Sequence, residues 1–256
     1  MHPLRIACPA GTPSATNASS YPPGVVSVAF CPSPPLLVPE LATGAAGELD
    51  PLRAACREAV RRLLATGPDH VVVVGAGPAA GRFPPGTTGT LAGYGVPVTA
   101  SLPTDHTRRG VSVAPGPAAE PVLPPALTLG AWLLARAGVP CSGVAVTAGT
   151  TVDLPDAPAF LVLGDGSARR SERAPGYVDP RAGAFDAAVE AALASGDAAG
   201  LRDLDPALGA DLLASGVPAW RAVGTALAPA APLEAELLYA EAPYGVGYFV
   251  ATWQAR

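Results

Sequence analysis

Val25-Val26-Ser27-Val28-Ala29-Phe30 is a largely apolar run rich in β-branched residues, and the turn Cys31-Pro32-Ser33-Pro34-Pro35 follows it directly. A run of this kind, closed by prolines, is typical of a buried strand that leaves the sheet through a rigid turn. Similar short runs recur further along the chain, at Val71 to Val74, Val96 to Leu102, Gly143 to Thr147 and Phe160 to Leu163. The opening stretch therefore predicts one strand of a larger sheet.

Alanine- and leucine-rich segments separate these runs and carry helix signals. The clearest segment has Asp50 as its expected N-cap and Pro51 at the first helical position, and it ends at Gly67-Pro68. Its apolar residues share one helical face, and its arginines occupy the other side: Leu52, Cys56, Val60, Leu63 and Leu64 against Arg53, Arg57 and Arg61.

Further helices are predicted in the second half of the chain. One runs from Leu127 to Ala137 and is closed by Gly138. Others follow Asp179-Pro180 and Asp205-Pro206, where an aspartate precedes a proline at the helix start. Their expected stops are Gly196 and Gly216.

Strand runs that alternate with helices predict an α/β fold with a central, mostly parallel or mixed sheet flanked by helices. Near the end, Ala235 to Tyr239 and Val246 to Trp253 surround the turn Pro243-Tyr244-Gly245, which predicts a C-terminal β-hairpin. With 256 residues, 49% of them apolar, the chain suits a single domain at residues 24–256. Residues 1–23 are rich in Pro, Ser, Thr, Gly and Asn, and predict a flexible leader.

Charge and hydropathy restrict the expected partners. A formal net charge of -5 argues against nucleic-acid binding, which needs a basic face. No apolar run reaches the roughly 18 residues that a transmembrane helix needs, and the start of the chain has no continuous apolar segment of a secretion signal. Cys8, Cys31, Cys56 and Cys141 form no C-x-x-C pair, which favours free thiols in a reducing cytoplasm.

The three histidines are scattered and suggest no metal site. His2 lies in the expected leader, and His70 precedes a predicted strand. His106 is the one histidine in a polar loop, between Asp105 and Arg108, but no nucleophile motif such as G-x-S-x-G accompanies it.

A glycine-rich stretch, Val71-Val72-Val73-Val74-Gly75-Ala76-Gly77-Pro78-Ala79-Ala80-Gly81, has the spacing of a dinucleotide-binding fingerprint. That fingerprint requires a helix beginning at the glycines, whose N-terminus holds the pyrophosphate. The sequence that follows, Arg82-Phe83-Pro84-Pro85-Gly86, cannot form this helix. A plain glycine turn is therefore the preferred interpretation.

The loop Gly164-Asp165-Gly166-Ser167 follows the predicted strand Phe160 to Leu163. In an open α/β sheet, loops at the carboxyl ends of strands form the ligand crevice, so Asp165 and Ser167 are well placed for binding. Arg169, Arg170 and Arg173 follow and could clamp a carboxylate or phosphate. A solvated charge run beside a turn is the other interpretation, and the sequence leaves both open.

Four stretches together resemble the class III extradiol dioxygenase catalytic-subunit family, of the protocatechuate 4,5-dioxygenase type. They are the loop Cys31 to Glu40, the glycine turn after Val74, Gly164-Asp165-Gly166-Ser167, and Ala242-Pro243-Tyr244-Gly245-Val246-Gly247-Tyr248-Phe249. The loop Pro32 to Glu40 is similar to that of an actinobacterial branch of the family. The resemblance covers nearly everything from Val25 to Trp253.

The resemblance implies a crevice in which two histidines and a carboxylate hold Fe(II), which binds a catechol and dioxygen for ring opening. It also implies a homodimer. In this chain, the first histidine position holds Ser33, the second falls near Gly77, and the acid-base histidine falls near Ala168. A serine and a glycine cannot replace two imidazoles, so we expect no Fe(II) cofactor and no ordinary ring cleavage.

Three functional hypotheses remain. The chain binds a small anionic or aromatic molecule in the inherited crevice, or it is an active oxygenase or hydrolase with a rearranged site, or it acts through its surface as an interaction or regulatory protein. The catalytic residues stay unassigned. The residues expected to line the crevice are Cys31, Ser33, Gly77, Asp165, Ser167, Arg169, Glu241 and Tyr244.

Overall fold

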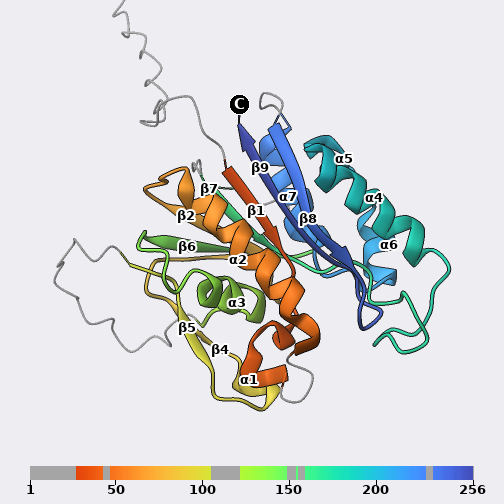
Figure 1. The fold of residues 1–256 in the computed structure, drawn as a ribbon, viewed down its shortest axis with the longest axis horizontal. Helices are drawn as coiled ribbons and strands as arrows, with labels where there is room; N and C mark the ends of the chain where they lie inside the picture. The colour runs from red at the N-terminus through yellow and green to blue at the C-terminus, as the bar shows by residue number, and fades with distance from the viewer. Residues whose placement is uncertain are drawn as a thin grey trace, which may run out of the picture.

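The computed structural model describes residues 27–42, 47–104, 122–148, 154, 159–228 and 233–255. Their main element is a seven-stranded sheet in the order β3-β6-β2-β7-β1-β9-β8 (Figure 1). Its strands are β1 (Ser27–Cys31), β2 (Val71–Ala76), β3 (Gly81–Phe83), β6 (Cys141–Val146), β7 (Ala159–Leu163), β8 (Leu233–Glu241) and β9 (Tyr248–Ala255). A separate two-stranded sheet pairs β4 (Thr88–Thr90) with β5 (Thr99–Ser101).

The four central strands, β6, β2, β7 and β1, run parallel, whereas β3 and β9 pair antiparallel to their neighbours. The central strands are buried on both sides, as their continuous valine- and leucine-rich sequences predict. β8 and β9 form the C-terminal hairpin. The predicted α/β fold, with its mixed sheet, flanking helices and terminal hairpin, is therefore confirmed.

Helices cover both faces of the sheet, and Figure 1 shows α2 and α3 in front of it with α7 behind. The first face carries α2 (Asp50–Ala65) and α3 (Pro125–Leu133), which pack on Ala29, Cys31, Val73 and Leu163. The second face carries α4 (Ala182–Ser195), α5 (Ala198–Arg202), α6 (Pro206–Asp211) and α7 (Val217–Leu227). Short elements complete the described part: η1 (Pro35–Leu37), α1 (Pro39–Ala42) and η3 (Ala92–Tyr94).

Three local predictions were wrong. Leu49, not Asp50, is the N-cap of α2, and Asp50 is its first helical residue. Arg53 lies buried in α2, because its guanidinium donates to the carbonyl oxygens of Leu36 and Leu37, each at 2.8 Å. Gly216 does not stop a helix; its φ of -76° is ordinary, and it is the N-cap of α7.

Two other elements differ from their expected extent. The run Val96 to Leu102 contributes only β5 to the small sheet, since Thr99 and Ser101 are exposed and offer no apolar face to the main core. The helix expected from Leu127 begins at Pro125 and ends at Leu133.

β2 is followed by the short strand β3, not by a helix. This confirms that the glycine-rich stretch lacks the helix of a dinucleotide site. Within the described ranges, no helix is both long enough and apolar enough to cross a bilayer. The expected leader and His106 lie outside the described residues.

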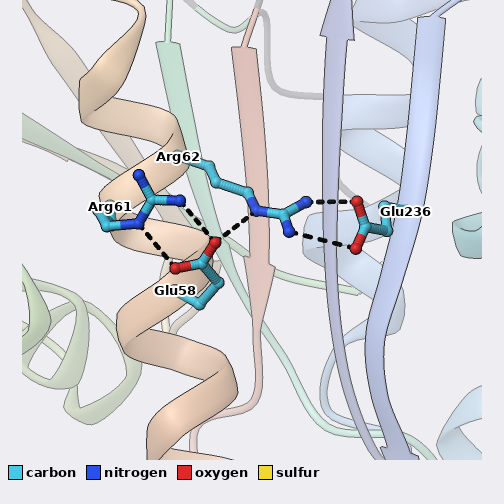
Figure 2. A network of polar contacts seen from close by, with 4 residues as sticks. All are labelled: Glu58, Arg61, Arg62 and Glu236. Atoms are coloured by element: carbon cyan, nitrogen blue, oxygen red, sulfur yellow. Dashed lines mark hydrogen bonds and ion pairs between the residues drawn. The ribbon is translucent and has the colours of Figure 1, made fainter.

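A surface network ties α2 to the edge strand β8, as Figure 2 shows. Glu58 accepts hydrogen bonds from Arg61 and Arg62, each from Nε at 2.7 Å, and these bonds hold the pKa of Glu58 at about 2. Arg62 also pairs with Glu236 at 2.5 Å. The network is exposed and stands apart from the strand ends described next.

Candidate functional site

Three polar residues meet where β7, β1 and β9 join their loops. The backbone N–H of Ser33, just after β1, donates to the Asp165 carboxyl. The N–H of Gly166 donates to Gly247 O at 2.7 Å and the N–H of Gly247 donates to Ser167 O at 2.9 Å, so the loop after β7 pairs directly with the residue before Tyr248. We call Ser33, Asp165 and Tyr248 the strand-end site.

The Asp165 carboxyl is held by its neighbours. The backbone N–H of Ser33 donates to Asp165 Oδ1 at 2.7 Å. The Asp165 carbonyl accepts from the N–H of Gly216 at 2.9 Å, and the Asp165 N–H donates to Ser215 Oγ at 3.3 Å. The loop after β1 is fixed in turn by Arg53, so both loops that build the site are anchored to helices.

Gly164 brings the Asp165 loop against the start of α7. A Cβ at Gly164 would lie only 2.2 Å from the Cα of Gly216. No side chain fits there, so the chain passes Gly216 in backbone contact. This contact fixes the position of the loop that carries Asp165.

Partial burial makes Asp165 a weaker acid than usual. Burial of the carboxyl raises its pKa to about 6, although hydrogen bonds from the Ser33 backbone and the Ser215 side chain act in the opposite direction. A carboxyl with this pKa changes its protonation state close to neutral pH, which ordinary aspartates do not.

Tyr248 brings a hydroxyl to the same place. The residue is 4% exposed, and no hydrogen bond is formed by its hydroxyl among the described residues. Arg169 Nε is the one side-chain polar atom there that is both fully buried and unpartnered, so the Tyr248 hydroxyl lies at the edge of the buried region. Burial raises the pKa of Tyr248, and the charge of Asp165 raises it further. The backbone bond from Gly166 N–H to Gly247 O, at 2.7 Å, holds Tyr248 beside the Asp165 loop, where the hydroxyl is open to a ligand.

Two further tyrosines flank the site on the hairpin. Tyr244 donates to Glu48 Oε2 at 2.9 Å and so ties the hairpin turn to the residues before α2. Tyr239 donates to Glu241 Oε2 at 3.2 Å, and burial raises the pKa of Tyr239 to about 12. Glu241 is exposed at the end of β8 and is engaged by this bond. Electrostatic interactions with Tyr244 and Tyr239 also raise the pKa of Tyr248.

Ser167 lies in a different environment from Asp165, although only one residue separates them. Its N–H and its hydroxyl both donate to the buried Asp186 of α4, each at 2.8 Å, and Arg170 pairs with the same carboxylate at 3.0 Å. Gly166 and Gly247 permit this arrangement, because a Cβ at either position would lie within 2.8 Å of an Asp186 oxygen. Ser167 therefore helps to hold the loop against the second face of the sheet.

The remaining predicted crevice residues are not brought to Asp165 by any contact in the described part of the chain. Arg169 lies against Gly176, and its Nε is buried without a hydrogen-bond partner there. Cys31 is buried on the α2 face, where a hydrogen bond with Cys56 and burial raise the pKa of its thiol. Gly77 lies at the end of β2, where a Cβ would lie 2.9 Å from Ala145 Cβ and 3.2 Å from Pro124.

These positions do not fit the Fe(II) site that the resemblance implies. Gly77 has no room for an imidazole, and Ser33 offers a hydroxyl where the family has its first histidine. Within the described ranges, no three His, Cys, Asp or Glu side chains gather as a metal-binding group. The groups that the described residues bring to the strand-end site are the Asp165 carboxyl and the Tyr248 hydroxyl.

Tyr248 and Ser215 were not among the residues expected from the sequence. The alternation of Tyr248-Phe249-Val250 signals a strand, but only the pairing of β9 with β1 shows which side faces Asp165. Ser215 is fifty positions from Asp165 along the chain, and no local pattern joins them.

No family model matches this chain, and none of the curated proteins compared with it does either. Its function is therefore argued from the geometry of the strand-end site.

Proposed function

We propose that this chain binds a small, uncharged aromatic molecule carrying a hydroxyl group, at the strand-end site and without a metal ion. The observation that carries the proposal is the Tyr248 hydroxyl, which forms no hydrogen bond within the described structure and stands beside the half-buried Asp165 carboxyl. A hydroxyl is both a donor and an acceptor. It can donate to Asp165 and accept from Tyr248 at the same time.

The energetics favour such a ligand. A ligand hydroxyl gives the Tyr248 hydroxyl a partner, and a hydrogen bond of this kind contributes about 0.5–1.5 kcal/mol. Tyr239 and Tyr244 are partly buried against the same hydrophobic cluster as Tyr248, so aromatic side chains lie near the polar pair. The resemblance of the strand-end loops to extradiol dioxygenases, whose substrates are catechols, supports a phenolic ligand as well.

An anionic ligand is less well supported by the charges. Asp165 would repel an anion whenever it is ionised. Arg170 is paired with Asp186, and Arg53 donates to Leu36, Leu37 and Asp50. The proposal therefore keeps the aromatic part of the expected ligand and replaces the anionic part by an uncharged hydroxyl.

The setting of this function is also a proposal. Cys31, Cys56 and Cys141 are free and buried, which supports a reducing compartment such as the cytoplasm. The net charge of -5 supports a small molecule over nucleic acid as the ligand. The family resemblance is the ground for proposing a homodimer, which light scattering of the purified chain would test.

Binding can be tested with ligand-observed NMR and calorimetry on chelator-treated protein. We expect phenol and catechol to bind more tightly than toluene or benzoate. Tyr248→Phe should weaken phenol binding about tenfold, in line with the loss of one buried hydrogen bond. Tyr94→Phe is the matched control, because Tyr94 is exposed on η3. Equal binding of phenol and toluene, or an unchanged affinity in Tyr248→Phe, would refute the proposal.

A further inference from the structure

We propose that the strand-end site also catalyses proton transfer at the carbon next to a carbonyl, interconverting a small aryl ketone and its enol. Asp165 is the base and Tyr248 is the donor to the carbonyl oxygen. This inference rests on the proposed function, since an enol has the planar C–OH group of a phenol. It goes further by assigning a reaction to the pair.

The geometry supplies a fixed base. Oδ1 of Asp165 accepts from the Ser33 N–H at 2.7 Å, so the carboxyl cannot rotate freely. The loop itself is fixed by the close approach of Gly164 to Gly216 and by the bond from Gly216 N–H to the Asp165 carbonyl. A positioned carboxylate of weakened acidity is a better proton acceptor near neutral pH than an ordinary aspartate.

The same site supplies a stabiliser for the developing charge. Tyr248 lies at the start of β9, which the Gly166–Gly247 backbone bond holds beside the Asp165 loop, and its hydroxyl forms no hydrogen bond in the part of the chain that is described. The residue is 4% exposed, so few water molecules compete for a hydrogen bond from its hydroxyl to an enolate oxygen. A carboxylate base combined with a tyrosine donor is an effective arrangement for enolisation.

The step balances without a further reactant. The α-carbon gives its proton to an oxygen of Asp165, and the C–H electron pair forms the carbon–carbon double bond. The carbonyl electron pair moves to oxygen, which accepts a hydrogen bond from Tyr248. Asp165 then exchanges its proton with water and returns one to carbon, or the oxygen takes a proton from water, Asp165 gives its proton to the hydroxide that remains, and the enol leaves. No electrons are gained or lost overall.

Other charged groups near the pair do not replace these roles. Glu48 and Glu241 accept hydrogen bonds from Tyr244 and Tyr239. Asp186 is occupied by Ser167 and Arg170 on the second face of the sheet. Asp165 is therefore the carboxyl that the fold leaves in reach of a ligand held by Tyr248.

The test uses phenylacetone in D2O and follows loss of its benzylic proton signal by NMR. We expect the wild-type chain to accelerate exchange at least about tenfold over buffer, with one of the two benzylic hydrogens exchanging faster because a bound ketone presents one side to Asp165. Asp165→Asn should return the rate to the buffer value, and Tyr248→Phe should lower it about 10- to 100-fold. Asp69→Asn, exposed at the opposite end of β2, should leave the rate unchanged.

Saturation-transfer NMR on the same samples separates the two proposals. Binding of phenylacetone without accelerated exchange would overturn the catalytic inference and leave the binding function standing. Failure of both phenol and phenylacetone to bind would overturn both. Exchange that persists in Asp165→Asn, or that shows no preference between the two hydrogens, would also count against Asp165 as the base. Thermal melts of each variant confirm that it is folded.

Discussion

Replacing Asp165 with asparagine should stabilise the folded chain, and should do so more at pH 8 than at pH 5. Burial raises the pKa of the Asp165 carboxyl from 3.8 to about 6. At about 1.4 kcal/mol per pH unit, ionising this carboxyl in the folded state costs on the order of 3 kcal/mol at pH 8. Asparagine avoids this cost and keeps an oxygen that can accept from the Ser33 N–H.

The sign follows from the direction of the change in pKa. Because the folded pKa is raised, the folded state binds the proton more tightly, and the penalty is absent below about pH 4 and complete above about pH 6 to 7. Roughly half of it is present at pH 5. The difference in unfolding free energy between Asp165→Asn and the wild type should therefore grow by about 1.5 kcal/mol from pH 5 to pH 8.

Urea unfolding at several pH values, followed by circular dichroism, measures this difference. Asp69→Asn controls for the loss of one negative charge, since Asp69 is exposed at the amino end of β2. If Asp165→Asn is less stable than the wild type at pH 8, or if its advantage does not grow with pH, the environment assigned to Asp165 is wrong.

Three other substitutions test the packing and the site. Tyr248→Phe should leave the melting temperature within a few degrees of the wild type, because the hydroxyl it removes has no partner among the described residues; a large drop in a thermal melt would reveal a structural role. Gly247→Ala should destabilise by several kcal/mol, because the new Cβ would lie 2.6 Å from Asp186 Oδ2, whereas Gly93→Ala, with nothing within 4 Å, should change little in urea unfolding. Leu63→Ala should cost about 2–5 kcal/mol, since Leu63 is 1% exposed on α2, and an unchanged unfolding midpoint would contradict this burial.

The sequence predicted the positions of the strands better than the contacts between them. The apolar runs located β1, β2, β6 and β7 closely, because a buried strand needs continuous apolar residues. The order of these strands depends on contacts between distant segments, and no local pattern specifies it. Arg53 shows that distant contacts also decide burial. Its helical position predicted the side opposite the apolar face, but the loop after β1 covers it, and Arg53 donates to the carbonyl groups of Leu36 and Leu37 there.

The candidate site was anticipated in part. The expectation that the Asp165 loop ends a strand and meets the loop of Ser33 agrees with the 2.7 Å bond between them. Ser167 was grouped with Asp165 by proximity in sequence, yet Gly166 lets the chain direct Ser167 to Asp186 on the other face. Tyr248 was missed because its neighbour across the sheet is set by the register of β9, which the hairpin sequence alone does not reveal.

A crystal structure of the chelator-treated chain grown with 4-bromophenol would show directly whether a phenol binds at the strand-end site, since bromine can be located by its anomalous signal. We expect bromine at this site, with the phenol oxygen about 2.6–3.2 Å from both the Asp165 carboxyl and the Tyr248 hydroxyl. A fully occupied ligand found only elsewhere, or a phenol oxygen that contacts neither group, would contradict it.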